Sequence, residues 1–231
     1  MYFIGDAFIE FKNLIKFLKI LKKVKYLKRS LLVIFILILS ACQDKENTNL
    51  NEQDAYMQLL PASKTGIDFN NSIQESEKVN QFYSSQIYNG AGVAIGDLNN
   101  DGLPDVFFCG NMVSDRLYLN KGEFKFKDIT STSKVGLIDG WSWGVTMADV
   151  NVDGFLDIYV SRNGQSMNPN DRKNLLYINN GDLTFTESAQ AYGLDDMGFS
   201  SQAVFFDMDN DGDLDMFQVN QPPDIRMNLN H

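Results

Sequence analysis

Short apolar runs alternate with a recurring acidic segment from residue 92 onward. The pattern is an apolar run, then Asp-x-[Asn/Asp]-x-Asp-Gly-x-x-Asp, then a second apolar run, and it occurs at residues 92–108, 144–160 and 202–218. The first aspartates of the three copies are 52 and 58 residues apart. Two apolar runs joined by turn-forming residues predict a β-hairpin. The chain therefore contains three copies of one predicted hairpin.

A second pair of apolar stretches follows each of the first two copies. Residues 116–126 read RLYLNKGEFKF, and residues 174–185 read NLLYINNGDLTF. Asn-Lys-Gly and Asn-Asn-Gly are turn sequences, so each segment predicts another hairpin. Each unit then has about four short strands, an arrangement typical of β-propeller blades. The mature chain shows no long stretch with helical periodicity.

These motifs resemble FG-GAP/VCBS repeats, the calcium-containing blades of some β-propellers. The amino-acid sequence of the repeats is also similar to the propeller part of secreted bacterial proteins of the ASPIC/UnbV (cartilage acidic protein-like) family. The resemblance covers about residues 65–231 and implies an all-β fold, a partial β-propeller of about two and a half four-stranded blades. The expected blades are residues 89–140, 141–198 and the incomplete 199–231. Because the third copy stops before its second hairpin, we expect the chain to be a fragment.

The N-terminal region has the features of an export signal. Lysines are frequent in residues 12–29, and the apolar run LLVIFILILSAC at residues 31–42 is shorter than the ~20 residues that cross a bilayer. Leu39-Ser40-Ala41-Cys42 resembles a bacterial lipobox. We therefore predict a lipoprotein signal helix at residues 1–41, lipidation and membrane anchoring at Cys42, and a flexible tether at residues 42–64. A buried apolar strand or a plain signal anchor is the alternative.

Location follows from the same region. Gln43-Asp44-Lys45-Glu46 resembles an acidic sorting signal of Gram-negative lipoproteins, although an ordinary solvated linker explains it equally well. A lipidated chain with this signal is expected at the bacterial outer membrane or cell surface, facing the periplasm or the exterior.

The charge distribution narrows the possible partners. The chain has a net charge of -10, but residues 1–41 contain eight basic and two acidic residues, which leaves a net charge of -16 for the rest. Because residues 42–231 are so acidic, this part of the chain repels nucleic acid and attracts cations. The single histidine is His231, which excludes histidine-based catalytic triads and histidine-ligated zinc. We expect no enzyme activity.

The acidic segments offer the oxygen ligands that calcium prefers. Calcium takes six to eight oxygens from carboxylates, carbonyls and water. The candidate ligands are side chains at positions 1, 3, 5 and 9 and the backbone carbonyl at position 7, while glycine at position 6 allows the sharp turn. The first acidic loop (residues 97–105) supplies Asp97, Asn99, Asp101, Leu103 and Asp105, the second (149–157) supplies Asp149, Asn151, Asp153, Phe155 and Asp157, and the third (207–215) supplies Asp207, Asp209, Asp211, Asp213 and Asp215.

These loops have two other interpretations. Asp, Asn and Gly also form turns without a metal through Asx hydrogen bonds, but three copies in register favour structural calcium. Magnesium and a catalytic metal fit less well, because magnesium retains water and a closed ligand set leaves little open coordination. The third acidic loop offers four carboxylates, so we predict that it binds calcium most tightly.

Some residues outside the loops also attract attention. Trp141 and Trp143 could stack on sugars, although core packing is favoured, and Cys109 is expected to be a buried thiol. Residues 161–174 form a longer loop with Arg162, Arg172 and Lys173, where solvated charge is the default interpretation.

The predicted function is that of an exported, lipid-anchored, calcium-stabilised binding or adhesion module for a glycan or protein. The alternatives are an accessory part of a larger extracellular polysaccharide-processing enzyme, or a truncated product with no independent function.

Overall fold

The computed structural model describes residues 57–77, 79–82, 86–136, 140–163 and 168–222. The chain divides into two compact units, residues 1–59 and residues 60–231. The predicted signal helix, Cys42 and the tether up to residue 56 lie outside the described residues, so those expectations remain predictions. Within the described ranges, no helix has the length and apolar character needed to cross a membrane.

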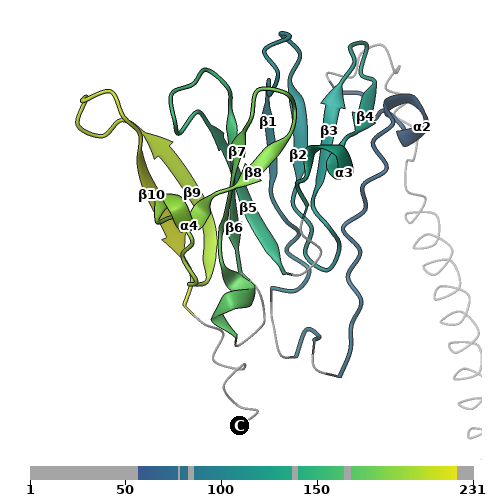
Figure 1. The fold of residues 1–231 in the computed structure, drawn as a ribbon. Coiled ribbons are helices and arrows are strands. Elements are labelled where there is room, and N and C mark those ends of the chain that lie inside the picture. The colour runs from purple at the N-terminus through teal and green to yellow at the C-terminus, as the bar shows by residue number, and fades with distance from the viewer. Residues whose placement is uncertain (1–56, 78, 83–85, 137–139, 164–167, 223–231) are drawn as a thin grey trace, which may run out of the picture. The chain divides into compact units, whose positions relative to one another are not determined.

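Three antiparallel sheets make up the second unit, and every hydrogen-bonded strand pair is a pair of sequence neighbours (Figure 1). The first sheet contains β1 (Val93–Gly96), β2 (Asp105–Phe108), β3 (Arg116–Asn120) and β4 (Phe126–Asp128), the second contains β5 (Ser142–Ala148), β6 (Asp157–Arg162), β7 (Leu175–Asn179) and β8 (Phe185–Glu187), and the third contains β9 (Ser200–Phe206) and β10 (Asp215–Asn220). The predicted all-β class is confirmed, and each of the first two repeat units forms a four-stranded sheet.

The helical segments of this unit are single turns between or before strands. They are α2 (Ala62–Thr65), α3 (Thr130–Ser133), the 3-10 turn η2 (Pro169–Arg172) and α4 (Ala189–Tyr192). The turn α2 includes the last three residues of the segment predicted as a tether.

The second sheet is buried on both faces because its side chains alternate with a period of two. Ile158 and Val160 of β6 belong to one core cluster, which they share with Phe107 and Leu117 of the first sheet. Tyr159, the residue between them, belongs to another cluster, which includes Ala203 of β9. The same strand therefore joins the first sheet to the third through two separate cores.

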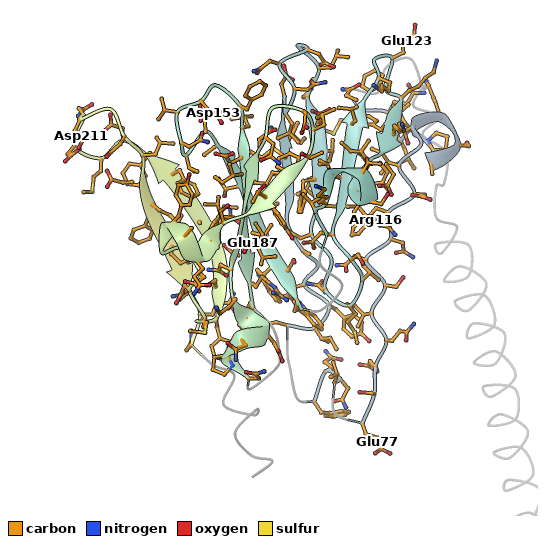
Figure 2. The ribbon with its side chains drawn as sticks, in the orientation of Figure 1. Glu77, Arg116, Glu123, Asp153, Glu187 and Asp211 are labelled. Atoms are coloured by element: carbon orange, nitrogen blue, oxygen red, sulfur yellow. The ribbon has the colours of Figure 1, made fainter. Side chains whose placement is uncertain are left out.

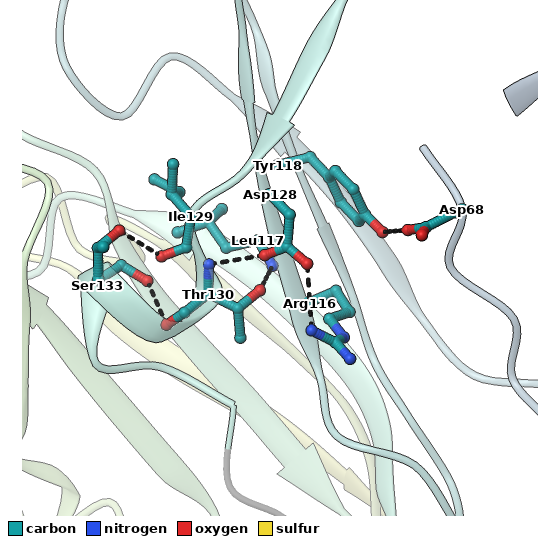
Figure 3. A network of polar contacts seen from close by, with 9 residues as sticks. Asp68, Arg116, Leu117, Tyr118, Asp128, Ile129, Thr130 and Ser133 are labelled. Carbon is teal, nitrogen blue, oxygen red and sulfur yellow. Dashed lines mark hydrogen bonds and ion pairs between the residues drawn. The ribbon is translucent and has the colours of Figure 1, made fainter. Parts of the chain in front are cut away.

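The other face of the first sheet is covered by the segment that precedes its strands. The ring of Phe69 stacks on Phe108 of β2 with centroids 5.0 Å apart. The Tyr118 hydroxyl of β3 donates a hydrogen bond to Asp68 (2.8 Å), as Figure 3 shows. By contrast, Phe217 of β10 remains 63% exposed. The third sheet therefore has an exposed apolar outer face, whereas the same face of the first sheet is covered at β2 and β3 and exposed at β1, where Ile95 is 65% exposed.

Side chains fix the turn that follows β4. The Asp128 carboxylate accepts a hydrogen bond from the N–H of Thr130 (2.9 Å) and forms an ion pair with Arg116 (3.1 Å; Figure 3). The Thr130 hydroxyl in turn accepts from the N–H of Leu117 (2.9 Å). Glu187 takes the corresponding place in the second sheet, where it accepts from the N–H of Ala189 (2.9 Å). The two four-stranded units thus repeat their local bonding as well as their strands.

A buried carboxylate connects the first sheet to the second. Asp115, 1% exposed, accepts hydrogen bonds from the N–H of Gly110 (2.7 Å) and from the hydroxyl of Ser142 on β5 (3.0 Å). Burial raises the pKa of Asp115 to about 6, although these two bonds and the nearby Arg162 charge lower it in part. The junction therefore contains a group that changes its charge near neutral pH.

Candidate metal sites

Each acidic loop joins the first two strands of its sheet. The three loops connect β1 to β2, β5 to β6 and β9 to β10, and Figure 1 shows all three at the same end of the sheets. Asp153 and Asp211, labelled in Figure 2, mark the second and third loops at that end. All fifteen predicted ligand residues are therefore found on three equivalent hairpin turns.

The first aspartate of each loop closes the turn by accepting backbone hydrogen bonds. Asp97 accepts from the N–H groups of Asp101 (3.2 Å) and Gly102 (2.7 Å). The equivalent bonds of Asp149 are 3.0 and 2.8 Å long, and those of Asp207 are both 3.2 Å. Gly102 has a φ of 83°, and the glycines at the same position in the other loops have similar values. The predicted glycine turn is thus confirmed.

The residue at position 4 of each loop also adopts a left-handed conformation. Asn100 and Asn210 have φ values of 57° and 63°, which asparagine tolerates. The second loop has Val152 there, with a φ of 57°. A β-branched side chain in this region is strained, so the second loop maintains its shape against a local conformational cost.

The last aspartate of the first two loops fixes the loop to the third strand of its own sheet. The two Asp105 oxygens accept from the N–H groups of Leu98 (3.0 Å) and Asn120 (2.8 Å). Asp157 does the same with Val150 (2.9 Å) and Asn179 (2.8 Å). Burial raises the pKa of both carboxyls, and the backbone donors partly offset that effect.

The third loop differs from the other two at this position. Asp215 is only half-buried and accepts from the N–H of Met208 (2.9 Å). The third sheet has two described strands, so the strand that would supply the second donor is not among the described residues. Asp215 is therefore less constrained than Asp105 or Asp157.

Carboxylates converge most clearly in the third loop. Asp207, Asp209 and Asp215 each place one oxygen within 4.8 Å of the others, the one such acidic group among the described residues. Asp213 has a raised pKa because of its hydrogen bond with Asp211 and the charge of that residue. Uncompensated negative charge is therefore concentrated in this loop.

The first two loops contain an amide where the third has Asp209. Asn99 donates to the Asp101 carboxylate (3.0 Å), and Asn151 donates to Asp153 (2.8 Å). These amides neutralise part of the local charge through hydrogen bonds. Their carbonyl oxygens accept from backbone N–H groups of the loop at 3.3 and 3.2 Å. The third loop therefore carries more negative charge than the other two, and it is the loop whose carboxylate oxygens converge.

The other residues considered in the sequence occupy ordinary structural positions. Trp141 is 6% exposed and Cys109 is 1% exposed, so their predicted burial is confirmed. Trp143 is half-buried. Arg172 is buried and lies 4.2 Å from the centre of the Phe199 ring, and Lys173 pairs with Asp195 (3.0 Å). The expectation of solvated charge is therefore wrong for Arg162 and Arg172, which are 4% and 7% exposed.

Sequence reasoning missed the asparagines that bond to the acidic loops. Asn120 and Asn179 end β3 and β7, and both were interpreted only as parts of Asn-x-Gly turns. Both asparagines begin an Asn-x-Gly motif at the end of the third strand of their unit, and this recurrence was the available signal.

Repeated hairpins with acidic turns, arranged as antiparallel sheets that pack face to face, define the class of this protein as an all-β repeat protein. The family model of the FG-GAP-like repeat matches residues 97–160 and 166–217, which together are half of the chain. The chain belongs to the FG-GAP-like repeat family.

A curated relative extends this comparison. Cartilage acidic protein 1 of Xenopus tropicalis is 32% identical over 130 residues, which are 55% of this chain and 19% of the relative. The match supports the resemblance to the ASPIC/UnbV family that was inferred from the sequences of the repeats. The chain thus matches about a fifth of the length of that relative.

Proposed function

We propose that the chain is an exported, calcium-stabilised binding module whose sheets are blades of a β-propeller. The observation that carries the calcium assignment is the convergence of Asp207, Asp209 and Asp215 in a loop geometry that occurs three times. Carboxylates that lie so near one another repel each other, and a divalent cation bound between them converts this repulsion into attraction.

The donor set fits calcium well. Carboxylate, amide and backbone oxygens are hard ligands, and the candidate ligand positions contain no cysteine, methionine or histidine. The residues that would hold the ion are those at positions 1, 3, 5, 7 and 9 of each acidic loop. When bound, calcium supplies charge neutralisation and fixes the turn. Hydrogen bonds within each loop also shape the turn, so calcium would add to the order that they provide.

The binding role rests on the family. FG-GAP repeat domains are typically extracellular binding modules. We extend this to a glycan or protein ligand, a non-catalytic role, and anchoring to the bacterial outer membrane or cell surface through Cys42. The acidic body disfavours nucleic acid as a partner.

Calorimetric titration of the full chain with calcium tests the central part of this proposal. We expect three bound ions in the wild type and two in Asp207→Asn, with the tightest site lost. The matched control is Glu123→Gln, which changes an exposed carboxylate in another turn, between β3 and β4 (Figure 2). A wild-type chain that binds no calcium, or an Asp207→Asn variant that keeps all three ions, would refute the assignment.

A second titration addresses the ligand. Immobilised full chain is exposed to a panel of bacterial and host polysaccharides, first in calcium and then in chelator. If the chelator weakens polysaccharide binding, the result supports a ligand surface organised by calcium. If binding is the same with and without chelator, the result contradicts it.

A further inference from the structure

One buried side chain touches both the first and the second acidic loop. Asn179, at the end of β7, is 2% exposed. Its side-chain amide donates to the carbonyl of Leu98 in the first loop (2.8 Å) and to that of Leu156 in the second (3.1 Å). Leu98 directly follows the candidate ligand Asp97. A single amide thus joins loops that belong to different sheets.

Asn179 is fixed by its remaining hydrogen bonds as well. Its side-chain oxygen accepts from the N–H of Gly181 (3.0 Å), and its own N–H donates to the candidate ligand Asp157 (2.8 Å). The connection is continuous, because the Leu98 N–H donates to Asp105 in the first loop. A movement of either aspartate therefore acts on the same buried amide.

A weaker contact runs parallel to this connection. The Asn100 side chain of the first loop donates to the Gly154 carbonyl of the second (3.0 Å). Both partners are exposed. Among the described residues, no hydrogen bond joins the second loop to the third. The first two loops are thus connected at two points, and the third is separate.

Asn120 provides a natural comparison for Asn179. It occupies the equivalent position in the first sheet, where its N–H donates to Asp105 (2.8 Å) and its amide to the Pro104 carbonyl (2.8 Å). Its side-chain oxygen accepts from the N–H of Gly122 (2.9 Å). Within the described part of the chain, these bonds reach only the first loop and its own turn. The two asparagines therefore differ in the inter-loop bond.

We propose that Asn179 couples the first two acidic loops, so that calcium bound at one raises calcium affinity at the other while the third loop binds independently. This inference rests on the proposed calcium function. An ion in the first loop restricts Leu98 and so holds Asn179 against Asp157. The ion that binds the second loop then has to order fewer loop residues, so it binds more tightly, which is positive cooperativity. By reciprocity, the second ion has the same effect on the first.

The test is a thermodynamic cycle on the full chain with the third site removed by Asp207→Asn. In this background, calcium titrations compare three proteins. One has the first and second loops intact, one carries Asp97→Asn and retains only the second site, and one carries Asp149→Asn and retains only the first. We expect the two-loop protein to bind its second ion at least about five-fold more tightly than the single loops predict. Asn179→Ala should remove this excess, whereas Asn120→Ala should keep it.

The outcomes separate the two proposals. If the two-loop curve equals the sum of the single-loop curves, the coupling is wrong while the calcium assignment survives. If the excess persists in Asn179→Ala, Asn179 is not the coupling residue. If the parent chain binds no calcium, the proposed function fails and the coupling fails with it. Should Asn179→Ala fail to fold, the comparison of single-loop and two-loop proteins still decides whether the loops are coupled.

Discussion

The buried carboxylate of Asp115 makes a specific pH dependence testable. Its pKa is about 6 in the folded protein, against 3.8 for an ordinary aspartate, mainly because of burial between the first two sheets. The folded state therefore binds more protons than the unfolded state between about pH 4 and pH 6. Stability contributed by this group is fully present below that window and is lost as the pH rises through it.

The magnitude follows from the shift. About two pKa units correspond to about 3 kcal/mol of unfolding free energy lost between pH 4 and pH 7. The groups that face Asp115 do not obscure the effect, because burial raises the pKa of both Cys109 and Tyr177 and keeps them neutral in this range. Arg162 remains charged throughout.

Asp115→Asn isolates this contribution. The amide oxygen can accept from Gly110, and the amide N–H can donate to the Ser142 hydroxyl, so the local geometry is retained. Urea unfolding in chelator should give equal stability at pH 4 and a variant more stable by up to about 3 kcal/mol at pH 7. Glu123→Gln, on the exposed surface, should follow the wild-type curve. Parallel pH profiles for wild type and Asp115→Asn would refute the reasoning.

Three further substitutions test the loop architecture by urea unfolding in chelator. Asp157→Ala leaves the N–H groups of Val150 and Asn179 without their partner and should cost about 2–5 kcal/mol, whereas Asp215→Ala removes one half-buried bond and should cost about 1 kcal/mol; equal costs would contradict the assigned role of Asp157. Val152→Asn replaces an exposed β-branched residue at a φ of 57° and should stabilise the protein by about 1 kcal/mol, and a loss of stability would show that the valine is not strained.

The repeat pattern predicted the strands because each apolar run had to be buried on alternating faces. The turn glycines and the acidic positions followed from the same pattern, since only certain residues allow such a turn. Asn179 escaped prediction because its partner Leu98 is 81 residues away, and no local pattern reports so distant a contact. Asp115 escaped because its sequence neighbours do not reveal that it is buried.

The sequence pattern predicted the strands of the third sheet but not how far their apolar residues are buried. The sequence predicts an incomplete third unit, and the structure describes β9 and β10 with Phe217 and Val204 exposed. Apolar residues on a complete hairpin normally pack against a neighbour. The pattern identified these strands correctly, but burial depends on what lies beside them.

Calcium-dependent melting of the full chain tests the central claim most directly. The melting temperature is followed by circular dichroism in chelator and in increasing calcium, with magnesium as the comparison. We predict a rise with calcium concentration, equivalent to about 2.7 kcal/mol for each site at a hundred times its dissociation constant, and little effect of magnesium. The same melting temperature in chelator and in excess calcium would contradict the account.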